Sequence, residues 1–125
     1  MNAGLLKALV TGQKLFNDGH FFECHEFLEE AWKQSLGWEK LMLQGLIQAA
    51  AGFHKLKMGS HAGSARLLKN AAGKLVSCGV EGDFLKDFAD ALLDSARAID
   101  EKRFDPAKTL KMKIVPGEGI EPTRA

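Results

Sequence analysis

The chain has little cysteine and no apolar run long enough to cross a membrane. Its two cysteines, Cys24 and Cys78, have a spacing that fits neither a metal knuckle nor a redox pair. We therefore expect free thiols in a reducing compartment, most simply the cytoplasm. The central uncharged stretch 41–53 is shorter than the roughly 20 apolar residues that a spanning helix needs. No membrane partner is expected, and the first fifteen residues lack the pattern of a signal peptide.

An excess of one charge is also missing. The 125 residues include 17 Lys and Arg against 16 Asp and Glu, so no strong overall field attracts nucleic acid. Between positions 40 and 74 all charged residues are basic, but no recognised nucleic-acid-binding motif accompanies them, so nucleic acid is an unlikely partner. The content of 46% apolar and 26% charged residues is typical of a soluble globular domain and excludes a disordered chain.

Proline is absent from the first 105 residues, because Pro106, Pro116 and Pro122 are the three in the chain. That part therefore contains no obligatory helix breaker. Glycines and polar pairs divide it instead, and the apolar spacing between them is helical. We predict an all-α fold, a single compact bundle over 1–105 with an extended, partly mobile C-terminal tail over 106–125. The predicted helices are 5–16, 21–35, 38–58, 62–76 and 83–102.

The third predicted helix is apolar nearly all round, as expected of a helix surrounded by others. Gly45, Ala49 and Gly52 lie at i, i+4 and i+7 and form a ridge of small residues. Each glycine costs roughly 1 kcal/mol of helix propensity relative to alanine. We therefore predict that another helix packs closely against this ridge. Trp38, at the start of the same helix, is predicted to pack in the core or as a hydrophobic staple.

The second predicted helix carries the chemistry of the chain. His25, Glu29 and Trp32 share the face on which its apolar residues also lie. His25 and Glu29 are at i and i+4, where side chains are neighbours about 6 Å apart at Cβ. An imidazole, a carboxylate and an indole therefore project together from the apolar side of one helix.

Two glutamines, Gln44 and Gln48, interrupt the apolar third helix, again at i and i+4. A buried amide left without a partner costs about 1–3 kcal/mol. Because a short turn around Gly37 joins the two helices, we expect them to pack antiparallel, with both glutamines facing His25 and Glu29. The predicted result is a polar pocket, with the indole of the second helix as part of its wall.

These motifs resemble a known family. The series Asn17-Asp18-Gly19, His25-x-x-x-Glu29-x-x-Trp32 and Gln44-Gly45-x-x-Gln48, followed by an alanine-rich stretch, is similar to the bacterial and archaeal domain-of-unknown-function family number 309. The resemblance covers roughly 15–75 and the proline-containing tail. It implies a small all-helical fold without an established activity. It also implies that His25 and Glu29 are metal ligands.

Three functions remain open. In the first, the pocket of His25, Glu29, Trp32, Gln44 and Gln48 binds a small polar ligand or a divalent metal ion, with His25 and Glu29 as metal ligands and Glu26 as a weaker candidate. In the second, the same residues form a metal-dependent hydrolase in which Glu29 or Glu26 activates water. In the third, the cluster only stabilises an interaction or scaffolding domain. A homo-oligomer is possible with each of them.

Overall fold

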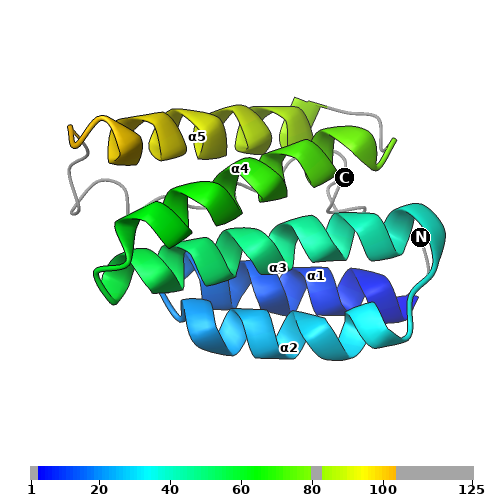
Figure 1. The fold of residues 1–125 in the computed structure, drawn as a ribbon. Coiled ribbons are helices and arrows are strands. Elements are labelled where there is room, and N and C mark those ends of the chain that lie inside the picture. The colour runs from blue at the N-terminus through cyan, green and yellow to red at the C-terminus, as the bar shows by residue number, and fades with distance from the viewer. Residues whose placement is uncertain (1–2, 80–82, 104–125) are drawn as a thin grey trace.

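A computed structural model of the chain describes residues 3–79 and 83–103, and this part contains five helices and no strand. Figure 1 shows the helices packed against one another, which confirms the predicted all-α bundle. Every predicted helix boundary lies within two residues of the observed one. The predicted tail over 106–125 lies outside the described residues. The helices are α1 (Ala3–Asn17), α2 (Phe21–Lys33), α3 (Gly37–Lys57), α4 (His61–Ser77) and α5 (Asp83–Asp100).

Short connections place consecutive helices side by side. Helices α2, α3, α4 and α5 follow one another across the molecule, and α1 packs against α2 (Figure 1). Because each connection is only a few residues long, neighbouring helices run antiparallel. Helix α2 is thereby an outer helix that contacts only α1 and α3 extensively. Within the described part, no helix is long and apolar enough to cross a membrane.

The helices end where the sequence allows a left-handed residue. Gly19 follows α1 with φ of +82°, and the N–H groups of Gly19 and His20 donate to the carbonyls of Phe16 and Leu15. This is a Schellman cap, which glycine forms without steric cost. Gly59 ends α3 in the same way. At the end of α5 the left-handed position is occupied by Lys102, with φ of +56°.

Phe16 joins four helices at the centre of the core. Its buried ring lies edge-on to Phe21 of α2, Phe53 of α3 and Phe88 of α5, with centroid separations of 5.1, 5.6 and 5.6 Å. Edge-to-face pairs of this kind add roughly 0.5–1.5 kcal/mol each beyond the burial of their area. The aromatic cluster therefore fixes α1 and α5 against the α2–α3 pair.

The small residues of α3 face α4, as predicted. A Cβ on Gly45 would lie 2.8 Å from Leu75 Cδ2, and one on Gly52 would lie 2.7 Å from Leu68 Cδ2. Because glycine has no side chain, Gly45 and Gly52 leave space on α3 that Leu75 and Leu68 of α4 fill. By contrast, the prediction that Trp38 packs in the core was wrong, because this residue is 40% exposed, and its role as a hydrophobic staple stays a prediction. Trp38 lies in the first turn of α3.

Candidate functional site

Helix α2 places its polar residues at the margin of its buried face. Phe21, Cys24 and Leu28 are buried in the core. His25 follows Cys24 in the sequence and is half-buried. Trp32 is partly buried and packs against the core. The imidazole and the indole therefore lie where α2 meets α3.

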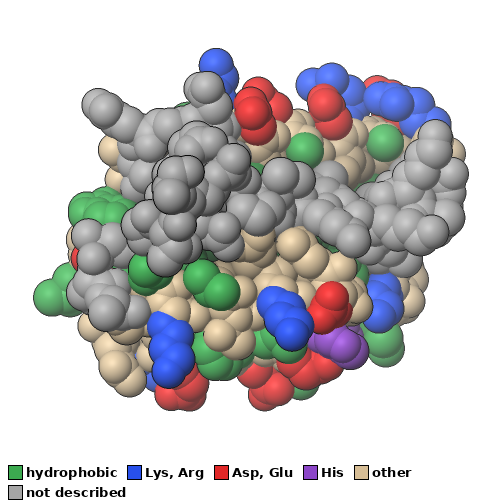
Figure 2. All heavy atoms as spheres, turned by 180° about the vertical axis from the view of Figure 1, so that it is seen from behind, with side chains coloured by type: hydrophobic (Ala, Val, Ile, Leu, Met, Phe, Trp, Pro, Cys, Tyr) green, Lys and Arg blue, Asp and Glu red, His purple; other side chains and the backbone are tan. Residues whose placement is uncertain are grey.

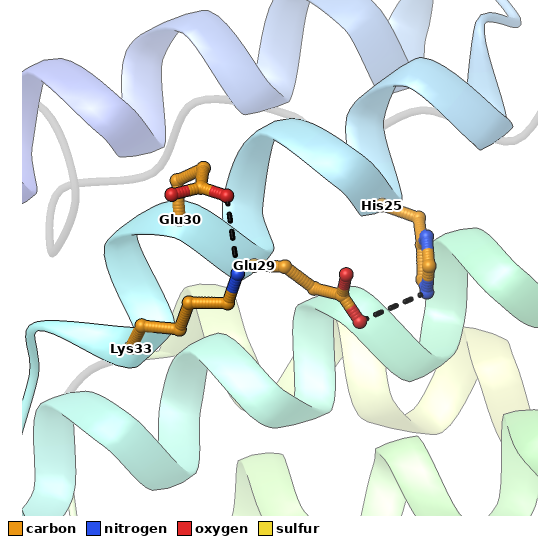
Figure 3. Close-up of polar contacts among 4 residues, drawn as sticks. All are labelled: His25, Glu29, Glu30 and Lys33. Carbon is orange, nitrogen blue, oxygen red and sulfur yellow. Dashed lines mark hydrogen bonds and ion pairs between the residues drawn. The ribbon is translucent and has the colours of Figure 1, made fainter.

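His25 and Glu29 form the pair that their spacing predicts. His25 Nε2 lies 3.4 Å from Glu29 Oε1, with side-chain exposures of 28% and 45%. Figure 3 shows the two side chains reaching toward each other along the side of α2 that neighbours α3. A separate ion pair joins Lys33 Nζ to Glu30 Oε1 at 3.2 Å. The carboxylate of Glu29 is thus directed to the imidazole and not to the lysine.

Two ring contacts cross from α2 to α3 and fix their register. Near one end, the rings of Phe22 and His54 are 5.3 Å apart, and Phe22 also stacks on His25 at 6.2 Å. Near the other end, the ammonium of Lys40 lies 4.2 Å from the centre of the Trp32 ring. We call the surface between these two contacts the α2–α3 edge. It comprises Phe22, His25, Glu29 and Trp32 of α2 and Lys40, Gln44, Gln48 and His54 of α3.

Several buried polar side-chain atoms have no hydrogen-bond partner within the described part of the chain. On α2 and α3 they are His25 Nδ1, Trp32 Nε1 and Gln48 Oε1, and on α4 Ser64 Oγ is another. Leaving such an atom unpaired costs about 1–3 kcal/mol, and most buried polar atoms in proteins are satisfied. Three of them belong to the α2–α3 helix pair, which makes this pair the candidate site.

The two glutamines do not close the network themselves. Within residues 3–79 and 83–103, neither Gln44 nor Gln48 hydrogen-bonds to His25 or Glu29. At about 100° per residue, Gln44 lies some 40° around α3 from Lys40, whereas Gln48 lies some 80° away, at the margin of the α2–α3 edge on the side toward α4. Gln44 therefore belongs to the side of α3 nearer α2. The five-residue pocket remains a prediction.

A metal centre of conventional composition is absent from the described residues. They contain no group of three or more His, Cys, Asp and Glu side chains arranged to hold an ion. Glu26, the weaker candidate, is exposed and points about 100° away from its neighbour His25. His54 also lies at the α2–α3 edge, where its ring contacts the ring of Phe22. Of the residues predicted as metal ligands, His25 and Glu29 are the two that lie close together.

Cys24 is a structural thiol. It is fully buried, and its Sγ donates a hydrogen bond to the carbonyl oxygen of Gly12 at 3.3 Å. Burial raises its pKa from the ordinary value of 9.0 to about 12, so the thiol stays protonated at neutral pH. Cys78 is also free and buried, as expected of the two cysteines. A nucleophilic role for Cys24 is inconsistent with this environment.

Two surface hollows lie away from the α2–α3 edge. One of about 300 Å³ lies along α1 and is lined by Val10, Gln13, Lys14, Asn17 and Asp18. Another of about 170 Å³ lies between the start of α1 and the end of α2, beside Leu5 and Ser35. The first includes Asn17 and Asp18 of the Asn17-Asp18-Gly19 motif, and neither includes a residue of the predicted pocket.

The predicted pocket did not include Phe22, Lys40 and His54, which complete the α2–α3 edge. Phe22 is three residues before His25, so its place beside the imidazole was available from helical spacing. Lys40 and His54 lie on α3 and contact residues of α2. Predicting these contacts requires the antiparallel alignment of the two helices to be known to the residue.

Fold and site together define a small all-helical domain with a His–Glu pair and unpaired polar atoms along one helix–helix edge. Residues 9–67 match the family model described as "Domain of unknown function (DUF309)". The match contains all five residues of the predicted pocket.

A curated relative extends the comparison without adding a function. An "Uncharacterized protein" of Aquifex aeolicus (strain VF5) is 35% identical over 71 residues, which cover 56% of this chain and 21% of the relative. The chain thus spans about a fifth of the length of that relative. No solved structure shows a significant match.

Proposed function

We propose that the α2–α3 edge binds a small polar ligand. The observation that carries the proposal is the set of buried, unpartnered atoms His25 Nδ1, Trp32 Nε1 and Gln48 Oε1. Trp32 supplies a donor, Gln48 an acceptor, and the imidazole supplies either, depending on its tautomer. A ligand that pairs with these atoms recovers the free energy that their desolvation costs.

The indole N–H of Trp32 is the probe for this proposal. In a ¹H–¹⁵N spectrum of the full chain it gives one of two indole signals, since Trp32 and Trp38 are the two tryptophans. A Trp38→Phe variant assigns the signals. The protein is titrated with separate small carboxylates, amides, amines and inorganic phosphate. We expect one of these classes to shift the Trp32 signal saturably while the exposed Trp38 signal stays in place.

Two variants test whether the shift comes from the edge. His25→Ala and Gln48→Ala should abolish it while each retains a cooperative melting transition. Gln34→Ala, which changes an exposed glutamine at the end of α2, is the matched control and should bind like the original chain. The proposal fails when no probe moves the Trp32 signal, or when the same shift persists in His25→Ala.

A divalent metal ion is the second candidate ligand, and one distance favours it. Zinc–nitrogen and zinc–oxygen bonds of 2.0–2.1 Å at tetrahedral angles separate two ligand atoms by roughly 3.3 Å. His25 Nε2 and Glu29 Oε1 are 3.4 Å apart. The two side chains thus have the separation that a shared ion requires. Water or a bound ligand would supply the remaining positions.

Elemental mass spectrometry tests the metal. The protein is purified without a histidine tag, then incubated with zinc, manganese or nickel and desalted. A stoichiometric ion that is lost in both His25→Ala and Glu29→Gln supports a metal site. Equal metal content in the original chain and both variants, or none in any, contradicts it without affecting the titration of the Trp32 signal.

The same variants distinguish the two remaining alternatives, a metal-dependent hydrolase and a purely structural cluster. A metal-dependent hydrolase requires the ion to be present first, and only then is a screen for hydrolysis informative. A purely structural cluster predicts that His25→Ala lowers the free energy of unfolding by a few kcal/mol, with no ligand lost, because a buried partner is removed. A binding site predicts nearly unchanged stability and lost binding.

A further inference from the structure

The exposed face of α2 carries an excess of negative charge. Four glutamates and one lysine lie between Phe21 and Lys33. Figure 2 shows carboxylates gathered along the lower edge of the molecule, the edge that α2 forms in Figure 1. Because α2 is an outer helix, this face is not covered by another described helix.

Three of the four carboxylates already have a partner. Glu23 lies 3.2 Å from His20, Glu29 lies 3.4 Å from His25, and Glu30 lies 3.2 Å from Lys33. Glu26 has neither an ion pair nor a hydrogen bond from its side chain within the described part of the chain, and it is exposed. It is therefore the carboxylate of α2 that is available to an external cation.

An aromatic ring lies one helical turn before Glu26. Phe22 is 46% exposed, although two imidazoles flank it. It stacks on His25 at an interplanar angle of 28°, and His54 approaches it from α3 at 5.3 Å. These contacts restrict the phenyl ring, and the residue still stays nearly half exposed.

We propose that Phe22 and Glu26 form a docking surface for an arginine-bearing basic segment of another protein. Residues at i and i+4 have Cβ atoms about 5–6 Å apart. A guanidinium group is planar, so it can stack on the phenyl face while its N–H groups donate to the neighbouring carboxylate. The negative charge of the rest of α2 attracts further basic residues of the segment.

The same helix provides a built-in comparison. Phe27 is 39% exposed and Glu30 is exposed, so they have the residue types of the proposed surface. Phe27 lies about 140° around the helix from Phe22, and Glu30 is already paired with Lys33. Substitutions of Phe27 and Glu30 therefore test whether binding depends on the arrangement of the two side chains or only on their residue types.

Titration with short peptides tests the docking surface. The ¹⁵N-labelled full chain is titrated with a capped glycine peptide containing two arginines, and with the same peptide in which citrulline replaces arginine. We expect saturable amide shifts centred on 22–26 with the arginine peptide and none with citrulline. Phe22→Leu and Glu26→Gln should each weaken binding about three- to fivefold, whereas Phe27→Leu and Glu30→Gln should change it less than twofold.

Several outcomes overturn the proposal. It fails when citrulline binds like arginine, or when Phe22→Leu and Glu26→Gln, folded by circular dichroism, bind like the original chain. It also fails when raising the protein concentration without peptide moves the same amide signals, because the occupant is then a second copy. Phe22 also belongs to the α2–α3 edge, but Trp32 and Gln48 take no part in the docking surface, so an arginine peptide that leaves the Trp32 indole signal in place is distinguished from a ligand of the proposed site.

Discussion

Gly45 of α3 and Leu75 of α4 are packed so closely that a methyl group does not fit between them. A Cβ at position 45 would lie 2.8 Å from Leu75 Cδ2 and 3.2 Å from the carbonyl oxygen of Ala71. Gly45→Ala should therefore lower the free energy of unfolding by about 1–3 kcal/mol, the usual cost of overpacking. Urea denaturation followed by circular dichroism measures the change.

Gly73→Ala is the matched control for this prediction. Gly73 lies within α4, and no atom lies within 4 Å of the position a Cβ would take. Here the substitution gains helix propensity without a clash, so stability should rise by roughly 0.5–1 kcal/mol. Equal changes in the free energy of unfolding for Gly45→Ala and Gly73→Ala would contradict the close approach of α3 and α4.

Removal of the Phe16 ring should be among the most damaging single changes in the described part of the chain. Its ring contacts three other phenylalanines and is 1% exposed. Phe16→Ala should cost about 3–5 kcal/mol, the range for large-to-small changes in a core. Val10→Ala, on the same helix and 44% exposed, should cost less than about 0.5 kcal/mol. Thermal melting of both variants checks the difference.

The buried thiol of Cys24 makes the domain sensitive to alkali. Below pH 9 the thiol is protonated in both states. Between the ordinary pKa of 9.0 and the folded pKa of about 12, the unfolded chain loses this proton and the folded protein keeps it. The free energy of unfolding should therefore fall with rising pH, by at most about 1.4 kcal/mol per unit from this group.

Cys24→Ala isolates the contribution of the thiol to this alkaline loss. The variant lacks the titrating group but keeps every other one, so its stability should decline less steeply above pH 9. Chemical denaturation at several pH values up to 11 gives both curves. Parallel curves for the two proteins would show that Cys24 is accessible to base in the folded state.

His25→Ala should change stability by no more than about 1 kcal/mol. Removing the imidazole loses its stacking on Phe22 and its contact with Glu29, but it also removes a buried nitrogen that has no partner. The two effects oppose each other. A loss of several kcal/mol in urea denaturation would instead mean that the imidazole is a satisfied structural element.

Lys102→Gly should stabilise the end of α5. Lys102 adopts φ of +56°, and the N–H groups of Lys102 and Arg103 donate to the carbonyls of Ile99 and Ala98. Glycine adopts this left-handed conformation without the Cβ clash, so a gain of about 0.5–1 kcal/mol is expected. The gain should be visible as a raised melting temperature, and a lowered one would contradict the cap geometry.

The local pattern of the sequence was enough for the helices and for the His25–Glu29 pair. Helix boundaries follow from glycine positions and from apolar spacing, and both are read along a single stretch of chain. The pairing of His25 with Glu29 also lies within one helix, where i and i+4 are neighbours in any register. The small-residue ridge on α3 likewise indicated close packing before its partner was known.

What the sequence by itself determined is therefore the all-α class, the helix limits and the pairing of His25 with Glu29 on α2. Tertiary structure alone decided which leucines fill the gaps at Gly45 and Gly52, and that Phe22 and Trp38 stay exposed. It also decided that Gln44 and Gln48 do not bond to the His–Glu pair. The physical reason is that these outcomes depend on how far one helix is shifted and rotated against another. Side-chain packing across the whole core sets that shift and rotation.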